Sequence, residues 1–240
     1  MMQKERYCFA DIPVSISYRY EYLKEQCKDY VSEQEPMFSL EITSEDLAAE
    51  RARAEHPDAS DDYLESLACY RKFCSLAVLE RVLLFHCSAV SVDGVAYLFA
   101  APSGTGKSTH TALWRRVLGE RAVMVNDDKP LIRLSPEQIS VYGTPWDGKH
   151  RLSNRISVPV GGICFLSRSA QNHIERLSPN DALPCLLGQT FRPDSEAGTA
   201  QMLQLLIELE GRVPMWSMGC NISEEAAWLA FSTMSKEIES

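Results

Sequence analysis

Residues 95–108 read Val-Ala-Tyr-Leu-Phe-Ala-Ala-Pro-Ser-Gly-Thr-Gly-Lys-Ser, and this stretch decides the fold. An apolar run, Val95–Ala100, leads directly into a loop of small residues that ends in Lys107 and Ser108. Small residues let successive backbone N–H groups curl around an anion, while the lysine reaches the outer phosphates and the serine hydroxyl binds Mg²⁺. The stretch therefore predicts a phosphate-binding loop, in which Ala101 replaces the glycine that usually opens the pattern.

The residues after the loop predict a helix. From Lys107 the chain continues Ser-Thr-His-Thr-Ala-Leu-Trp-Arg-Arg-Val-Leu and reaches Gly119, a residue suited to ending a helix. The N-terminal end of such a helix carries partial positive charge, which favours bound phosphate. We therefore expect ATP, with GTP as the alternative, together with Mg²⁺. The expected nucleotide-binding residues are Ser103, Gly104, Thr105, Gly106, Lys107, Ser108 and Thr109.

The residues before the loop predict a β-hairpin. Two strand-like runs, Val82 to Val92 and Val95 to Ala100, flank the dipeptide Asp93-Gly94, which favours a type I′ turn. The strand that enters the loop should therefore pair antiparallel with the preceding one. Doubly wound nucleotide-binding folds usually reach that strand by parallel alternation, so the sequence favours a different sheet. We expect an α/β fold, with α+β as the alternative. Further strands are expected at Ala122–Asn126, Leu131–Leu134, Ile139–Tyr142, Ile156–Leu166 and Val213–Ser217, and helices after Ser178-Pro179, Glu196 and Ser223.

A pair of carboxylates follows the apolar strand after the helix. Val125 is followed by Asn126-Asp127-Asp128, about twenty residues beyond the loop lysine, where a Mg²⁺-organising carboxylate is expected. Adjacent side chains leaving a strand point to different sides, so one aspartate can face the metal and the other the incoming nucleophile. A phosphoryl-transfer kinase needs an aspartate that accepts a hydroxyl proton. Asp-Asp-Lys-Pro is also ordinary turn chemistry, and only its pairing with the phosphate-binding loop favours the catalytic interpretation.

These features together resemble a known group of kinases. His86, the Asp93-Gly94 turn, the loop and Asn126-Asp127-Asp128 are similar to the core of the HPr kinase/phosphorylase and PEP carboxykinase-like superfamily, over roughly residues 82–134. The resemblance implies a mixed-sheet P-loop kinase core. It also implies that the nucleotide and acceptor site is lined by His86, Lys107, Ser108, Asp127 and Asp128, with Asp128 as the proton acceptor and Asp127 near the metal with Ser108.

The chain also departs from that group. HPr kinases usually carry an acidic residue after the loop serine, where this chain has Thr109, and their acceptor-protein loop is not recognisable here. PEP carboxykinases are much longer and add a transition-metal site. We therefore expect a compact, divergent kinase whose acceptor is not HPr.

A basic segment stands out in the acidic chain. Residues 143–155, Gly-Thr-Pro-Trp-Asp-Gly-Lys-His-Arg-Leu-Ser-Asn-Arg, read as a loop because of their glycines and proline. Lys149, Arg151 and Arg155 are candidate contacts for the γ-phosphate or for an acidic acceptor, and Trp146 is a stacking or packing face. An exposed turn whose charges only balance nearby acids is an equal alternative.

Composition sets the class of protein. The chain has 240 residues with a net charge of −9, which argues against a nucleic-acid partner because such binding relies on clustered Lys and Arg. No apolar run approaches a membrane span, and eight cysteines without a C-x-x-C pair fit a reducing compartment, so we expect a cytoplasmic protein without a membrane partner. Residues 1–80 are expected to form an N-terminal α+β region and residues 81–240 the kinase-like domain. A homo-oligomer remains open.

The leading functional hypothesis is an ATP-dependent kinase acting on a hydroxyl, most plausibly of Ser or Thr in a peptide or small protein. One alternative is a nucleotide-binding switch or regulatory ATPase, which shares the loop but uses water or no chemistry. Another is a small-molecule or carboxykinase-like enzyme, in which the basic segment would bind the substrate.

Overall fold

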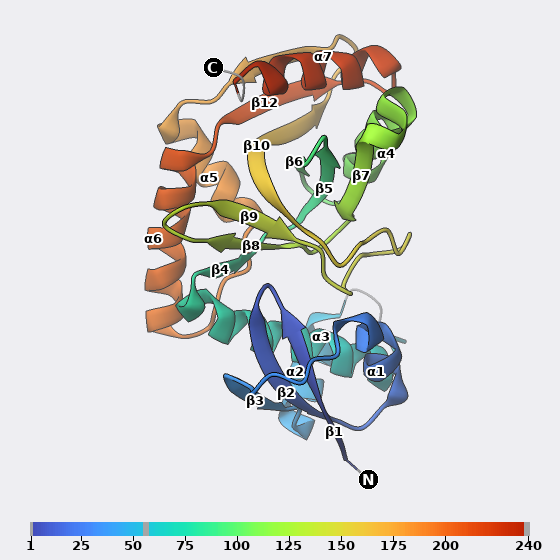
Figure 1. The fold of residues 1–240 in the computed structure, drawn as a ribbon, viewed down its shortest axis with the longest axis vertical. Helices are drawn as coiled ribbons and strands as arrows, with labels where there is room; N and C mark the ends of the chain where they lie inside the picture. The colour runs from blue at the N-terminus through green and yellow to red at the C-terminus, as the bar shows by residue number, and fades with distance from the viewer. Residues whose placement is uncertain (1, 55–57, 238–240) are drawn as a thin grey trace.

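The computed structural model describes residues 2–54 and 58–237. Figure 1 shows an N-terminal unit at the bottom and a larger unit built around a long mixed sheet above it. The N-terminal unit contains β1 (Gln3–Phe9), β2 (Ile12–Tyr18), α1 (Glu21–Cys27), β3 (Phe38–Glu41), α2 (Ser44–Arg53) and α3 (Asp61–Ala77). The larger unit contains β4 (Val82–Leu84), β5 (Cys87–Val92), β6 (Val95–Ala100), α4 (Lys107–Leu118), β7 (Ala122–Asn126), β8 (Leu131–Leu134), β9 (Ile139–Tyr142), β10 (Ser157–Arg168), β11 (His173–Arg176), α5 (Pro179–Gln189), α6 (Glu196–Arg212), β12 (Met215–Cys220) and α7 (Glu224–Met234).

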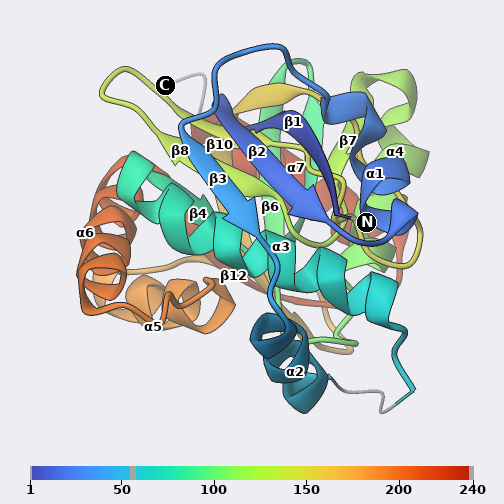
Figure 2. The same ribbon diagram turned by 90° about the horizontal axis from the view of Figure 1, so that it is seen from below.

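The N-terminal unit is a three-stranded sheet covered by α3. β1 and β2 form an antiparallel hairpin, and β3 adds to β2 in parallel. Figure 2 shows α3 running beside this sheet, and the Phe73 ring of α3 meets the Phe9 ring of β1 edge-on at 5.3 Å. The core formed there also includes Val82, Leu131 and Trp146 of the larger unit. Because the two units share apolar packing, the boundary expected between residues 80 and 81 stays a prediction.

The large sheet is mixed, in agreement with an α/β fold. Its order is β4-β8-β9-β10-β6-β5-β7. Strand β10 changes neighbours along one edge, since residues 157–159 pair antiparallel with β9 and residues 163–168 pair parallel with β12. Its other edge pairs in parallel with β6, and β11 pairs antiparallel with β12. The sheet thus combines both kinds of pairing around its longest strand.

The expected hairpin before the phosphate-binding loop is confirmed. β5 and β6 are antiparallel from Cys87↔Ala100 to Val92↔Val95. The turn residues Asp93 and Gly94 have φ values of 51° and 85°, the left-handed conformation that a type I′ turn requires at both central positions. The strand that enters the loop is therefore antiparallel to β5 and parallel to β10.

Helices cover both faces of the large sheet (Figure 1). On one face, buried residues of α5 and α6 such as Leu186 and Leu206 join one apolar core. On the other face, Trp114 of α4 and Ala230 of α7 join a second core. This layered packing holds the N-terminal end of α4 at the end of β6. Among the described residues, no helix combines the length and hydropathy that crossing a bilayer requires.

The expected strands are present, and three of them differ in extent. β7, β8 and β9 have the expected bounds, whereas β10 and β12 end two and three residues later than expected. The run Val82 to Val92 is two strands, β4 and β5. The Phe85 N–Pro130 O bond of 3.3 Å still follows the pairing with β8, but His86 N bonds to Gln189 O at 2.7 Å. This second bond leads to the end of α5 and ends the ladder of β4.

Candidate functional site

The predicted phosphate-binding loop, residues 101–108, has the expected strand, loop and helix order. β6 ends at Ala100, and α4 begins at Lys107 with Gly106 as its N-cap. Gly104 and Gly106 have φ values of 75° and 123°, which residues with a side chain rarely adopt. A Cβ at either position would meet no atom within 4 Å, so glycine is required there by the backbone conformation and not by crowding, and the space next to the loop is open.

The loop exposes its backbone and buries its lysine. Ser103, Gly104 and Thr109 are exposed, Thr105, Gly106 and Ser108 are partly exposed, and Lys107 is buried. The first N–H groups of a helix have no partner within the helix, and its N-terminus carries partial positive charge. The open space above the glycines and these donors fit a polyphosphate held by Lys107 and Ser108.

The Lys107 ammonium is held beneath the loop. Its Nζ donates to Ala101 O at 2.9 Å, and the side chain is buried. Burial lowers the pKa of Lys107, and the negative charges of Asp128 and Asp127 act in the opposite direction. Both aspartates predicted for the site are therefore within electrostatic reach of the predicted phosphate-binding lysine.

Asn126 shapes the turn that carries the aspartates. It is fully buried at the end of β7, and its Oδ1 accepts from the backbone N–H groups of Asp128 and Lys129, both at 2.8 Å. Its Nδ2 donates to Thr144 O at 3.0 Å and to Thr144 Oγ1 at 3.1 Å. The amide thus fixes the backbone after β7 and joins it to the basic segment.

Asp127 faces the helix of the phosphate-binding loop. It is buried and accepts a hydrogen bond from Ser88 Oγ of β5. Because Ser88 gives its one hydroxyl proton to Asp127, Thr111 Oγ1, 3.0 Å away on α4, donates to Ser88 Oγ. A chain of hydroxyl groups therefore links Asp127 to the N-terminal half of α4, the side on which a metal organiser is expected.

Asp128 faces a different set of groups. Its Oδ1 lies 3.1 Å from His86 Nε2, and its Oδ2 accepts from Lys129 Nζ at 2.6 Å. Burial acts to raise the pKa of Asp128, but the hydrogen bond from His86 and the charge of Lys129 outweigh it and hold the pKa at about 2. The group is a carboxylate at neutral pH. The expectation that His86 belongs to a strand is wrong, since it lies between β4 and β5, but its side chain does reach the aspartate pair.

The basic segment is fastened to both units. Asn154 N donates to Val125 O at 3.1 Å. Trp146 is buried and stacks on Tyr70 of α3, with ring centroids 4.0 Å apart and an angle of 6°. Of the two uses considered for Trp146, packing is therefore the one observed. Gly148 passes close to Asp128, because a Cβ added to Gly148 would lie 3.0 Å from the Asp128 Cβ.

The three cations of the segment lie in two environments. Lys149 and Arg151 are exposed on the part of the loop that passes Asp128. Arg155 instead donates to Asp29 O at 2.6 Å and lies over the Tyr30 ring at 5.7 Å, so it holds the N-terminal unit. Arg155 is therefore engaged with the N-terminal unit, whereas Lys149 and Arg151 follow Gly148 in the part of the segment near Asp128.

Sequence reasoning missed several residues around the site. Asp147 accepts from Ser153 Oγ at 2.8 Å, and burial raises its pKa, with the charge of Asp127 adding to the effect. Gln189, with its amide nitrogen turned toward the loop, donates to Ala101 O at 3.1 Å. Asp147 lies inside the basic segment, residues 143–155, so the sequence alone could have identified its carboxylate as a candidate. Gln189 is brought in from α5, and no local pattern marks it.

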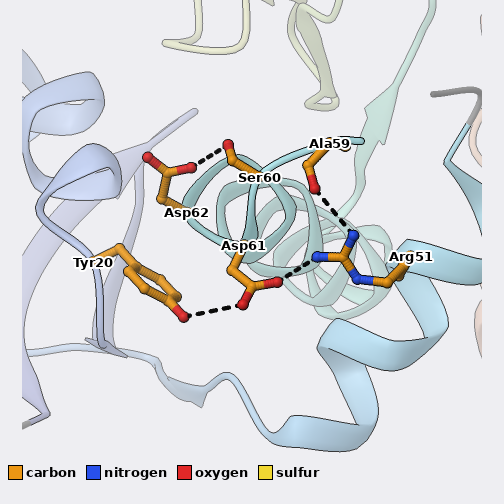
Figure 3. Close-up of a pocket in the computed structure, with 6 residues that line it drawn as sticks. All are labelled: Tyr20, Arg51, Ala59, Ser60, Asp61 and Asp62. Carbon is orange, nitrogen blue, oxygen red and sulfur yellow. Dashed lines mark hydrogen bonds and ion pairs between the residues drawn. The ribbon is translucent and has the colours of Figure 1, made fainter. Parts of the chain in front are cut away.

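A hollow lies in the N-terminal unit, away from the predicted site (Figure 3). It measures about 500 Å³. Arg51 pairs with Asp61 and donates to Ala59 O at 3.1 Å, and Tyr20 OH donates to Asp61 at 3.4 Å. The polar groups drawn there bind one another, and this mutual pairing accounts for their arrangement. Its lining consists of Tyr20, Arg51, Ala59, Ser60, Asp61 and Asp62.

Comparison with known proteins gives little beyond this geometry. No protein-family model matches the chain, and no curated protein matches its sequence. Among solved structures, it is similar to the Hpr(Ser) kinase/phosphatase from Coxiella burnetii, with a TM-score of 0.34 and 12% identity over 65% of this chain and 94% of that chain. At that TM-score the likeness carries no functional argument, and the residues of the site have to supply it.

Proposed function

We propose that this protein is an ATP-dependent kinase that transfers the γ-phosphoryl group to a hydroxyl of Ser or Thr in a peptide or small protein. The observation that carries the proposal is that Asp127, next to Asp128 after β7, is joined through the hydroxyls of Ser88 and Thr111 to α4, the helix that begins at Lys107. A loop for phosphate beside two ionisable carboxylates is the arrangement that phosphoryl transfer requires.

The loop and α4 hold the nucleotide in this proposal. Backbone N–H groups from Gly104 to Ser108 bind the phosphates, and Lys107 moves its hydrogen bonds from Ala101 O to phosphate oxygens. Mg²⁺ neutralises charge on the transferred group, and Ser108 and Asp127 are the residues that would hold it. The hydroxyl chain from Ser88 to Thr111 keeps Asp127 oriented toward α4.

Asp128 receives the acceptor hydroxyl. The acceptor oxygen bonds to the γ-phosphorus, the bond from that phosphorus to the β–γ bridging oxygen breaks, and ADP leaves with the released electron pair. The hydroxyl proton passes to Asp128. A pKa of about 2 makes Asp128 a weak base. The proton therefore transfers late, as a loose transition state permits, and the main work of Asp128 is to orient the hydroxyl.

The acceptor approaches from the side of the basic segment. Lys149 and Arg151 are exposed there, and Gly148 passes against Asp128. These cations supply positive charge next to the reacting phosphate, where charge-assisted contacts are strong. The arrangement supports an acceptor that carries acidic groups near its hydroxyl.

The test is transfer of label from γ-labelled ATP to a library of Ser- and Thr-containing peptides and small alcohols. We expect labelled peptide with the wild-type protein and a loss of at least about a hundredfold in turnover with Asp128→Asn, which should still bind ATP. Asp127→Asn should also weaken Mg²⁺-dependent binding. Asp194→Asn, at an exposed aspartate, is the matched control and should be active.

Three results would redirect the proposal. Full activity of Asp128→Asn would remove that residue from catalysis. Steady ATP hydrolysis without any labelled acceptor would favour a regulatory ATPase. Label found only on a small alcohol would favour a small-molecule kinase.

A further inference from the structure

We propose that the pocket between the start of α4 and the ends of β10 and β12 binds the nucleobase of the nucleoside triphosphate. The inference rests on the proposed function for the phosphates, and it adds a second subsite that the loop and the aspartates do not include. The pocket measures about 600 Å³, enough for a base and its ribose.

The pocket begins where the phosphate-binding loop stops. One wall is made by Gly104, Thr105 and Thr109 of the loop and first helical turn, with Leu113 one turn further along α4. Asp127 and Asp128 do not line it. A triphosphate whose outer phosphates lie at Lys107, beside the aspartates, must send its ribose and base out of the loop on another side. The adjoining pocket receives them.

The opposite wall offers an apolar side chain and a guanidinium. Ile222 follows β12, lines the pocket and is 81% exposed, so its apolar surface is open to a ligand. Arg168, the last residue of β10, donates to Gly104 O at 2.5 Å, so its guanidinium is held at the loop. An aliphatic side chain and a planar guanidinium are suitable surfaces for the face of an aromatic base. Covering Ile222 with the base removes its apolar surface from water.

The wall on α4 also contains a buried donor without a partner. His110 lines the pocket and is 2% exposed, and its Nε2 accepts from Trp114 Nε1 at 3.1 Å. A neutral imidazole that accepts at Nε2 carries its proton at Nδ1. Within the described part of the chain this Nδ1 has no hydrogen-bond partner. Unsatisfied buried donors are rare in folded proteins, and this one belongs to a residue that lines the pocket.

The experiment compares a nucleotide with a phosphate chain that has no base. Calorimetry measures the affinity of wild type, Ile222→Ser and Ile207→Ser for Mg·ATP and for inorganic tripolyphosphate with Mg²⁺. We expect Ile222→Ser to weaken ATP binding about tenfold, equivalent to about 1.4 kcal/mol, and to leave tripolyphosphate binding unchanged. Ile207 is 60% exposed on α6, so Ile207→Ser is the matched control and should change neither affinity.

Each outcome separates the two proposals. Equal affinity of the wild type for ATP and tripolyphosphate, or unchanged ATP affinity in Ile222→Ser, would overturn the base pocket and leave the phosphate site intact. An equal loss for both probes in Ile222→Ser would also overturn it, because the residue would then act on the loop. Lys107→Ala should lose both probes. Failure of the wild type to bind either probe would refute the nucleotide site itself and the inference with it.

Discussion

The buried histidine of α4 gives a measurable pH dependence of stability. Burial lowers the pKa of His110 to about 4, whereas a histidine in the unfolded chain has a pKa near 6.5. Between these values the unfolded chain binds a proton that the folded protein does not. The free energy of unfolding therefore falls as pH decreases from about 6.5, and the contribution is lost by about pH 4.

The size of the effect follows from the two pKa values. The full contribution is about 3 kcal/mol, and about 2 kcal/mol of it is lost between pH 8 and pH 5. His110→Gln removes the titrating group and keeps an acceptor for Trp114 Nε1. Urea unfolding at several pH values should therefore show a free energy of unfolding that declines about 2 kcal/mol less in the variant than in the wild type.

A matched variant isolates the buried group. His150 is exposed on the basic segment, and His150→Gln should follow the wild-type pH dependence. Parallel curves for wild type and His110→Gln between pH 8 and pH 5 would refute the reasoning, because His110 would then titrate alike in the folded and unfolded states. Such a result would also remove the tautomer argument for its unpartnered Nδ1.

Three further predictions concern the turn and the basic segment. Asn126→Ala should lower the free energy of unfolding by about 2–4 kcal/mol and reduce turnover, because it removes buried hydrogen bonds to the aspartate turn. Chemical denaturation measures the first effect, and a kinase assay measures the second. Gly143→Ala should destabilise the fold, because its Cβ would lie 1.9 Å from a backbone oxygen. Gly211→Ala lies inside α6, where the new Cβ would meet no atom within 4 Å, and should raise the free energy of unfolding by about 0.5–1 kcal/mol. Equal effects of the two variants in thermal unfolding would contradict this prediction. Neutralising Lys149 and Arg151 together should reduce phosphoryl transfer while changing stability by no more than about 1 kcal/mol, and a variant that loses stability but not activity would assign them a structural role.

Local patterns predicted the hairpin and the strand, loop and helix order around residues 101–108 well. Asp93-Gly94 demands left-handed φ values that few dipeptides adopt, and the spacing of Gly104, Gly106 and Lys107 leaves few alternatives to the observed loop. The break at His86 was not predictable, because it depends on a backbone bond to a residue more than a hundred positions later. Interactions of that kind leave no trace in local periodicity.

The surroundings of the aspartates show the same limit. The sequence indicated that Asp127 and Asp128 would approach Lys107, but the different partners of the two side chains come from separate strands. Arg155 was selected for its charge alone, and its carbonyl partner belongs to the N-terminal unit. Charge and spacing therefore identified the candidate residues, while tertiary contacts determined which of them share an environment.

The stacking of Trp146 on Tyr70 makes the larger unit depend on the N-terminal unit, so we expect the two to be inherited together. Tyr70 OH also donates to Lys129 O at 2.7 Å, one residue beyond Asp128, so α3 supports the aspartate turn from outside its own unit. A recombination event that joined this larger unit to an unrelated N-terminal partner would separate the turn from that support. The N-terminal unit is therefore not a detachable module, and the two units should be exchanged between proteins only together.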